Sequence, residues 1–251
     1  MQYSLEGKVV LITGSSRGIG ASIAKRLASE KCNVIINYNK SKEQAEAVLR
    51  ECQQCGGDHM LIHGDMTCEE QVKQLCKEVM SKYGHIDALI NNAGIALHNM
   101  VYRMKEEQWD QVLQANLKST FLCSKYFSKP MMKQKQGKIV NVASYVGEIG
   151  CSGQASYAAS KAGMIAFTKS LSKEIGAWGV LVNAVCPGYI QTELENREKA
   201  INISSDNTKQ EWRDYLEVHD YLDVLLNFIT FMCSDCFHSI TGQVFRLDAR
   251  H

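Results

Sequence analysis

The stretch Lys8-Val9-Val10-Leu11-Ile12-Thr13-Gly14-Ser15-Ser16-Arg17-Gly18-Ile19-Gly20 decides the fold. Its apolar run predicts a buried strand over residues 8–13, and a helical pattern follows over 19–30. Glycines between them allow a tight turn and a close approach of the backbone to a pyrophosphate, and the helix start supplies free amide donors. The spacing is GxxxGxG, which alone can mark a simple turn. Its place between strand and helix predicts a phosphate-binding loop.

Short apolar runs alternate with helical stretches along the rest of the chain. This pattern predicts an α/β fold with a parallel sheet and helices on both faces. The remaining expected strands are 33–38, 59–63, 86–91, 138–143, 180–186 and 243–247, and the remaining expected helices are 41–51, 67–83, 106–134, 155–175 and 212–232. We see no repeat or linker and expect one domain over 1–251.

Three local features refine this plan. Thr67-Cys68-Glu69-Glu70 has the form of a capping box and predicts the start of the helix that ends near Tyr83. Pro130 is expected to break or kink the helix 106–134 near its end. Residues 193–210 are polar and lack periodicity, so they form either a lid or a long solvated loop.

The charge balance and the cysteines bear on partners and location. With 28 basic and 27 acidic residues, the net charge is +1 and gives no electrostatic reason to expect nucleic acid or a membrane as partner. No apolar run could span a bilayer or serve as a secretory signal, and ten cysteines then indicate the cytoplasm. The pairs Cys52/Cys55 and Cys233/Cys236 have metal-like spacing, but no histidine or third pair completes a zinc site, so we expect no metal.

The end of the second strand bears on the choice of cofactor. An acidic residue there would bind a ribose hydroxyl and repel a 2′-phosphate. The chain has Asn37-Tyr38-Asn39-Lys40 instead, and Arg17 lies in the glycine loop. Arg17 and Lys40 favour NADP(H) over NAD(H), although Lys40 can equally be an ordinary solvated lysine.

Tyr157 and Lys161 are four residues apart and would share one face of a helix. A nearby ammonium lowers the pKa of a tyrosine from about 10, so that it can protonate a carbonyl oxygen as hydride arrives at carbon. The YxxxK spacing is common by itself. Its surroundings matter, because Gly14, Asn91, Ser144 and Pro187-Gly188 follow strands whose carboxyl ends meet at one edge of a parallel sheet.

Five segments, taken together and in order, resemble the short-chain dehydrogenase/reductase family over nearly the whole chain. They are residues 13–20, Asn91-Asn92-Ala93-Gly94, Ser144, Tyr157-Ala158-Ala159-Ser160-Lys161 and Pro187-Gly188-Tyr189-Ile190-Gln191-Thr192. The resemblance implies a single Rossmann domain with a seven-stranded parallel sheet. It also implies that Tyr157 is the general acid/base, that Lys161 lowers its pKa and binds the nicotinamide ribose, that Ser144 orients the carbonyl and that Asn116 completes the proton relay.

The same resemblance implies the binding residues. Cofactor contacts would be Gly14, Ser16, Arg17, Gly18, Ile19, Gly20, Asn37, Asp65, Met66, Asn92, Ala93, Gly94, Tyr157, Lys161, Pro187, Gly188, Ile190 and Thr192, with Asn91 assisting and Asp65 at the adenine. Substrate contacts would be Ser144, Gln154 and Tyr157.

Within the family, the chain is most similar to bacterial 3-oxoacyl-[acyl-carrier-protein] reductases. The similarity rests on residues 103–109, Asn116-Leu117-Lys118, 153–157 and Ile240-Thr241-Gly242-Gln243. It implies NADPH-dependent reduction of a 3-oxoacyl thioester on acyl carrier protein or coenzyme A. It also implies a homotetramer or homodimer, formed partly through the long helices after the fourth and fifth strands.

Departures from that pattern concentrate towards the C-terminus and leave the tetramer packing and the acyl pocket open. Trp178 stands near the place of a carrier-docking basic residue, for which Lys135 could substitute, and Val224 replaces a helix-starting Asp, with Asp223 one position earlier. The ending Asp248-Ala249-Arg250-His251 replaces Asp-Gly-Gly. One rival is therefore an enzyme for another ketone or alcohol, such as a polyketide intermediate, sugar or steroid. The other, a cofactor-binding sensor or scaffold, would have a broken Ser-Tyr-Lys set, whereas this chain has all three residues.

Overall fold

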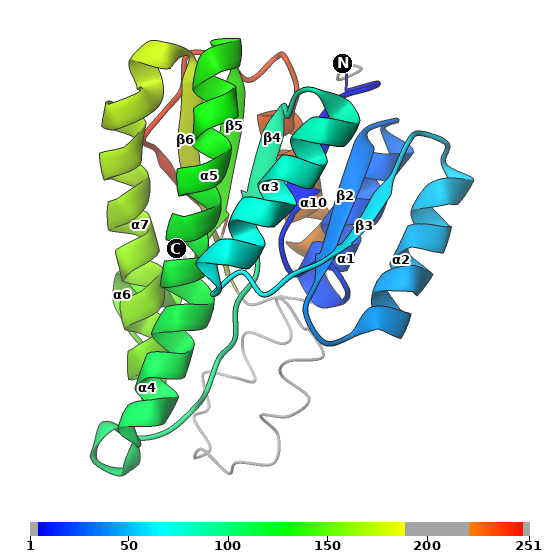
Figure 1. The fold of residues 1–251 in the computed structure, drawn as a ribbon. Coiled ribbons are helices and arrows are strands. Elements are labelled where there is room, and N and C mark those ends of the chain that lie inside the picture. Colours follow the sequence, from blue (N-terminus) through cyan, green and yellow to red (C-terminus); the bar gives the residue numbers. More distant parts are fainter. Residues whose placement is uncertain (1–4, 189–220, 248–251) are drawn as a thin grey trace.

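Seven parallel strands form one sheet in the order β3-β2-β1-β4-β5-β6-β7 (Figure 1). The computed structural model describes residues 5–188 and 221–247. The strands are β1 (Val9–Ile12), β2 (Asn33–Tyr38), β3 (Met60–His63), β4 (Ala88–Asn91), β5 (Gly137–Val142), β6 (Val180–Pro187) and β7 (Val244–Leu247).

Helices cover both faces of this sheet. They are α1 (Gly18–Ser29), α2 (Lys42–Gln54), α3 (Glu69–Tyr83), α4 (Glu106–Leu113), α5 (Ser119–Gln134), α6 (Val146–Ile149), α7 (Ala155–Ile175) and α10 (Tyr221–Cys233). Short 3-10 turns lie at η1 (Val101–Arg103) and η3 (Gly176–Trp178), and η2 (Gln114–Lys118) is a π-helical segment between α4 and α5. Helices α1, α2 and α10 pack on one face, and α3, α5 and α7 pack on the other.

The strands are continuously apolar because both of their faces are buried. In β1, Val10 and Ile12 belong to the core under α1, α2 and α10, whereas Val9 and Leu11 belong to the core under α3, α5 and α7. All four residues have no exposed surface. A parallel sheet between two helical layers requires this pattern.

The order of the strands places the site. Strands β1, β2 and β3 extend towards one edge of the sheet, and β4 to β7 extend towards the other, so the direction reverses between β1 and β4. Ligands bind beyond the carboxyl ends of strands at such a point. The loops after β1, β4 and β5 lie at the same end of the sheet, at the bottom of Figure 1.

The predicted doubly wound sheet of seven parallel strands is confirmed, with strand ends shifted by up to two residues. The capping box was wrong. Helix α3 begins at Glu69 after Cys68, and the Thr67 hydroxyl donates to Asp65 Oδ1 at 2.8 Å instead of capping the helix. Of the two outcomes expected at Pro130, a break or a kink, the break was wrong, because α5 runs through Pro130 to Gln134.

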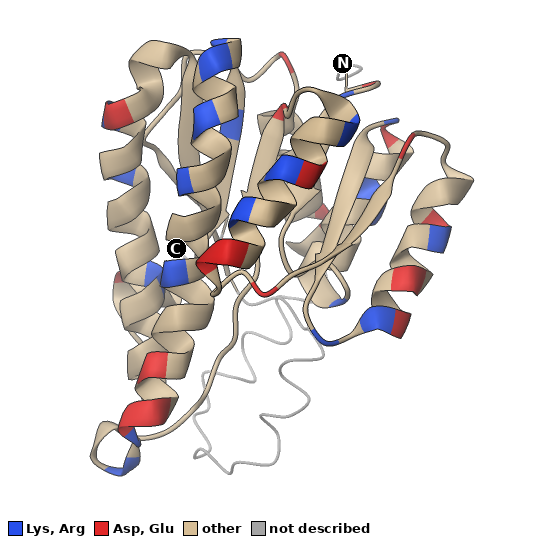
Figure 2. Cartoon of the chain, in the orientation of Figure 1, with Lys and Arg blue, Asp and Glu red and all other residues tan. Residues whose placement is uncertain are grey.

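Some expectations concern residues beyond the described part. These are the lid or loop at 193–210, the first half of the helix 212–232, Ile190, Thr192 and the ending 248–251. Within the described part, no helix is long and apolar enough to cross a membrane, and no group of three metal-ligating side chains is found. Figure 2 shows acidic and basic residues mixed along α2 and α3, whereas the charged residues of α4 are all acidic and those of α5 are all basic.

Candidate active site

The glycine loop follows β1 and opens α1. Gly14 and Gly18 have φ of 62° and 55°, which favours glycine. A Cβ at Gly14 would lie 2.9 Å from Ala93 Cα, and one at Gly20 would lie 2.6 Å from Gly14 O. The loop therefore packs against the turn after β4 so closely that Gly14 and Gly20 leave no room for side chains.

Buried polar side chains hold the loop in place. Asn37 Oδ1 accepts from Gly14 N–H at 3.1 Å, and Asn37 Nδ2 donates to Gly64 O at 3.1 Å. Asn92 Nδ2 donates to Thr13 O at 3.0 Å, and Thr13 Oγ1 accepts from the N–H groups of Asn92 and Ala93. The side chains of Asn37 and Asn92, both expected as cofactor contacts, are thus bonded to the loop itself.

The outer side of the loop suits a phosphate group. Arg17 is exposed at the N-cap of α1, whose first turn contains no acidic residue. A Cβ at Gly18 would meet no atom of the described residues within 4 Å. The amide groups at the start of α1 and the exposed cation fit the pyrophosphate of a dinucleotide.

Asp65 follows β3 at the same edge and is half-buried. Burial alone would raise its pKa. Hydrogen bonds from the N–H and hydroxyl of Thr67 and from Asn39, together with the charge of Lys40, lower it overall. Asp65 is thus an ionised acceptor beside Lys40, and Met66 next to it is buried.

Tyr157 and Lys161 lie one turn apart near the start of α7. Lys161 Nζ is 5.6 Å from the centroid of the Tyr157 ring and donates to Val142 O, at the end of β5, at 2.6 Å. Lys161 is 4% exposed, and burial lowers its pKa to about 8, while Cys186 opposes this slightly. The structure therefore brings the expected acid/base pair together, with the amine anchored to the sheet.

Ser144 lies two residues after Val142, whose carbonyl holds Lys161, and its position depends on the short helix α6. Ser144 Oγ accepts from Val146 N–H at 3.3 Å, and Ser144 O accepts from Gly147 N–H at 3.0 Å. A Cβ at Gly147 would lie 2.8 Å from the backbone of Lys161. The expected motifs did not include Gly147. The only feature of the sequence that could have indicated its role is its position three residues after Ser144.

Asn116 lies in the π-helical segment η2 and has no exposed surface. Its Oδ1 accepts from Ile95 N–H at 2.7 Å, and its Nδ2 donates to Ile95 O at 3.0 Å and to Ser160 Oγ at 2.9 Å. A Cβ at Gly94 would lie 2.9 Å from Asn116 Oδ1. The side chain of Asn116 thus connects the loop after β4 to helix α7. The π-helical form of η2 agrees with a functional role, because π-type turns often occur at functional sites.

Asn91 faces the interior rather than the edge. It is 2% exposed, and its Nδ2 donates to Ser124 Oγ and to Asn141 Oδ1. Pro187 closes β6, and its carbonyl accepts from Tyr145 N–H at 3.2 Å, so the turn at Pro187-Gly188 adjoins the loop that carries Ser144. Gln154 lies immediately before α7 as its N-cap.

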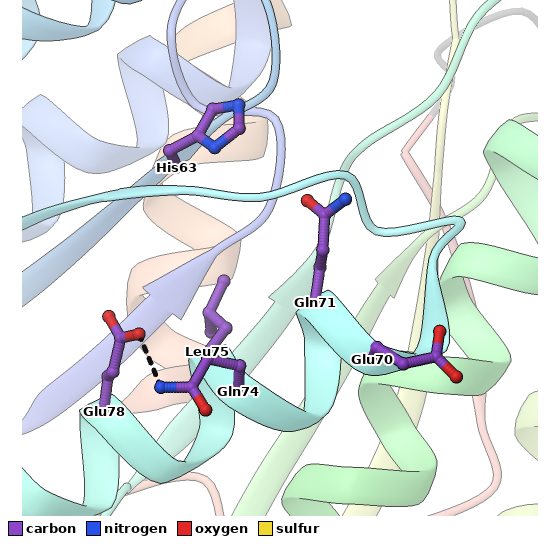
Figure 3. A pocket seen from close by; sticks show the side chains of 6 residues that line it. All are labelled: His63, Glu70, Gln71, Gln74, Leu75 and Glu78. Atoms are coloured by element: carbon purple, nitrogen blue, oxygen red, sulfur yellow. Dashed lines mark hydrogen bonds between the residues drawn. The ribbon is translucent and has the colours of Figure 1, made fainter.

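A hollow on the outside of the sheet borders this arrangement near Asp65, whose N–H donates to Oε1 of the lining residue Gln71 at 2.8 Å (Figure 3). It lies between the edge strand β3 and α3, and Gln74 Nε2 donates to Glu78 Oε1 at 2.9 Å along its wall. Its lining residues are His63, Glu70, Gln71, Gln74, Leu75 and Glu78. Because the lining has two carboxylates and no Lys or Arg, it does not suit a phosphate.

A dinucleotide loop and a tyrosine–lysine pair at the carboxyl edge of a parallel sheet define a nicotinamide-dependent oxidoreductase that acts on CH–OH and C=O groups. The family model described as short chain dehydrogenase matches residues 8–203, and the chain belongs to that family.

Curated relatives match nearly the whole chain. A 3-oxoacyl-[acyl-carrier-protein] reductase FabG from Staphylococcus aureus strain Mu50 is 41% identical over 244 residues, which cover 96% of each chain. A 3-oxoacyl-[acyl-carrier-protein] reductase from Synechocystis is 39% identical over 98% of this chain and 97% of its own. A solved structure from Sinorhizobium meliloti 1021, assigned to the short-chain alcohol dehydrogenases, has a TM-score of 0.85 at 27% identity and covers 99% of this chain and 97% of its own.

The two positions considered for carrier docking lie far from the site. Lys135 is exposed just before β5, Trp178 is 54% exposed just before β6, and a Cβ at Gly179 would contact the carbonyl of Lys135. Both lie at the amino edge of the sheet. They are separated from Tyr157 by the length of the 21-residue helix α7, which is about 30 Å.

Proposed function

We propose that this protein reduces the 3-keto group of a 3-oxoacyl thioester to a hydroxyl group with NADPH. The observation that carries the proposal is the Tyr157–Lys161 pair, whose amine is held on Val142 O next to Ser144. Relatives that are 39–41% identical over nearly the whole chain and named 3-oxoacyl-[acyl-carrier-protein] reductases support the choice of substrate.

The residues of this chain would share the chemistry as follows. NADPH, when bound, supplies the hydride. The Ser144 hydroxyl donates a hydrogen bond to the keto oxygen, and the Tyr157 hydroxyl transfers its proton to that oxygen. The Lys161 ammonium stabilises the phenolate that remains on Tyr157 and binds the ribose. Gln154, at the start of the same helix, would contact the thioester.

Binding of the cofactor would rest on the outer side of the glycine loop. The amides of residues 16–20 would bind the pyrophosphate, and Asp65 and Met66 would border the adenine. Arg17 and Lys40, both exposed at this edge, would bind the 2′-phosphate. The absence of an acidic side chain at the end of β2, where Asn37 is turned towards the loop, favours NADP(H) over NAD(H).

A second candidate function is reduction of another ketone or oxidation of another alcohol. The observation that favours it is the changed C-terminal region, where Val224 is 45% exposed on α10 and Trp178 is exposed near the expected carrier contact. The distance of Lys135 and Trp178 from Tyr157 gives no support to carrier docking at these residues on the same protomer.

Assembly into a homodimer or homotetramer through α5 and α7 is part of the proposal. Phe121 on α5 is 45% exposed and packs against Phe167 on α7, with 6.3 Å between the ring centroids. We expect the exposed ring of Phe121 to be covered by a second protomer in such an assembly.

The two functions can be separated by the substrate that drives NADPH oxidation. Acetoacetyl-CoA should be reduced with a clear preference for NADPH over NADH, and 3-hydroxybutyryl-CoA should be the product. Binding of NADPH without turnover of acetoacetyl-CoA, together with turnover of a non-thioester ketone, would move the protein to the second candidate function.

A further inference from the structure

The hydroxyl of Ser160 connects the catalytic helix to the rest of the site. Ser160 immediately precedes Lys161 on α7 and has no exposed surface. Its Oγ accepts from Asn116 Nδ2 at 2.9 Å and donates to the backbone carbonyl of Tyr157 at 2.7 Å. One hydroxyl therefore links the amide of Asn116 to the residue that carries the reactive phenol.

Asn116 continues this connection to the loop after β4. An asparagine amide nitrogen has two hydrogens, and those of Asn116 are used by Ile95 O and by Ser160 Oγ. Its Oδ1 accepts from Ile95 N–H at 2.7 Å. A continuous chain of hydrogen bonds thus runs from Ile95 through Asn116 and Ser160 to Tyr157.

The surroundings leave this chain little freedom. A Cβ at Gly94 would lie 2.9 Å from Asn116 Oδ1, and a Cβ at Gly163 would lie 2.7 Å from Leu117 Cδ2. The π-helical segment therefore approaches the loop after β4 at Gly94 and helix α7 at Gly163 so closely that neither glycine leaves room for a side chain. Small displacements at this point would move the turn that carries Tyr157.

Packing alone does not require a hydroxyl at this position. Ala158 and Ala159 occupy the same turn, and alanine is the better helix former. Within a helix, a serine hydroxyl that bonds to a carbonyl of the preceding turn alters the local geometry. Here that carbonyl belongs to Tyr157, so the hydroxyl acts on the orientation of the catalytic turn.

We propose that Ser160 is a positioning residue for the reduction. Through Asn116 it fixes the Tyr157–Lys161 turn relative to the loop after β4, which would border the nicotinamide. This inference rests on the proposed function, since it assigns Ser160 a role in placing the proton donor. Errors of about 1 Å in such placement can cost about a hundredfold in rate.

Ser156 offers a matched control on the same helix. It lies one turn before Ser160 and has no exposed surface, and its hydroxyl has no hydrogen-bond partner among residues 5–188 and 221–247. Ser156→Ala and Ser160→Ala thus remove the same atoms from equally buried sites, but only Ser160→Ala removes the hydrogen bonds to Asn116 and to the Tyr157 carbonyl.

The experiment compares kcat, KM and melting temperature for both variants with acetoacetyl-CoA and NADPH. We expect Ser160→Ala to lower kcat about tenfold or more, because a buried donor of Asn116 loses its partner, with KM and NADPH affinity nearly unchanged. Ser156→Ala should leave kcat within about twofold. Equal kcat for the two variants would overturn the proposal. If Ser160→Ala does not fold, we compare Ser160→Thr with Ser160→Cys. Ser160→Thr should have the higher kcat, because the cysteine thiol is a weak hydrogen-bond donor. Equal kcat values for these two variants would also overturn the proposal.

Amide hydrogen exchange provides a readout that needs no substrate. Ser160→Ala should speed exchange in both the loop after β4 and the first turns of α7, whereas Ser156→Ala should change neither. Faster exchange confined to α7 would contradict a link through Asn116. Turnover by the unchanged protein tests the proposed function separately, so the failure of either idea can be recognised.

Discussion

Two lysines are buried at opposite ends of β5. Lys138 lies at the amino end and is 9% exposed, whereas Lys161 reaches the carboxyl end from α7 and is 4% exposed. Burial lowers the pKa of both amines. By burial and pKa alone, the two residues would be equal candidates for a functional site.

Their partners separate them. Lys138 Nζ donates to the carbonyls of Cys233 and Ser234, at the end of α10, and Asp235 and Asp87 partly offset the effect of burial on its pKa. A cation at that place satisfies helix-terminal carbonyls. Lys161 donates to Val142 O and lies beside the Tyr157 ring, at the edge where the glycine loop opens. What a buried lysine faces, rather than its perturbed pKa, indicates catalysis.

The largest expected effect is on turnover. Lys161→Met should lower kcat by about a hundredfold or more, because the phenolate of Tyr157 loses its stabilising charge. Lys138→Met should leave kcat of the folded protein within about threefold. Steady-state rates with acetoacetyl-CoA check both variants, and a comparable loss in both would remove the distinction between the two lysines.

The next prediction concerns the exposed cation Arg17, whose removal should have an effect of intermediate size on cofactor affinity. Arg17→Ala should weaken NADPH binding about tenfold and leave NADH binding nearly unchanged, because Arg17 would contact only the 2′-phosphate. Arg50, exposed near the end of α2, gives a matched control in Arg50→Ala. Titration by cofactor fluorescence measures the affinities, and equal losses for NADPH and NADH would exclude this role for Arg17.

The last comparison concerns stability as a function of pH, rather than turnover or binding. The pKa of Lys161 falls from 10.5 to about 8 on folding, so the unfolded chain binds more protons between these values and stability rises with pH across that window. Lys161→Met removes this rise, which we expect to be about 3 kcal/mol.

Denaturant unfolding of both proteins between pH 8 and 10.5 measures the difference. Lys138→Met should remove a smaller rise, because carboxylates oppose the effect of burial there. Parallel curves for the unchanged protein and Lys161→Met would show that the amine is not desolvated in the fold.

Much of this molecule could be predicted from its sequence because the signals are local. Apolar runs such as residues 9–12 mark strands buried on both faces, and the glycines at 14, 18 and 20 mark the turn into α1. The spacing of Tyr157 and Lys161 places them on one helical face. Each of these patterns can be recognised from residues that are close together in the sequence.

What could not be predicted depends on contacts between distant segments. The π-helical segment at Asn116 is fixed by Ile95 and by Ser160, which is 44 residues away. The Thr67 hydroxyl turned to Asp65 instead of capping α3, and Pro130 was accommodated within α5. Four-residue α6 is too short to show periodicity, yet it sets the position of Ser144.

The most direct test of the central claim is the rate of acetoacetyl-CoA-dependent NADPH oxidation by Tyr157→Phe, measured with its affinity for NADPH. This substitution removes the transferable proton and keeps the ring beside Lys161. We predict that turnover falls by at least about a hundredfold while NADPH binding is retained. Turnover equal to that of the unchanged protein would contradict the assignment of Tyr157 as the proton donor.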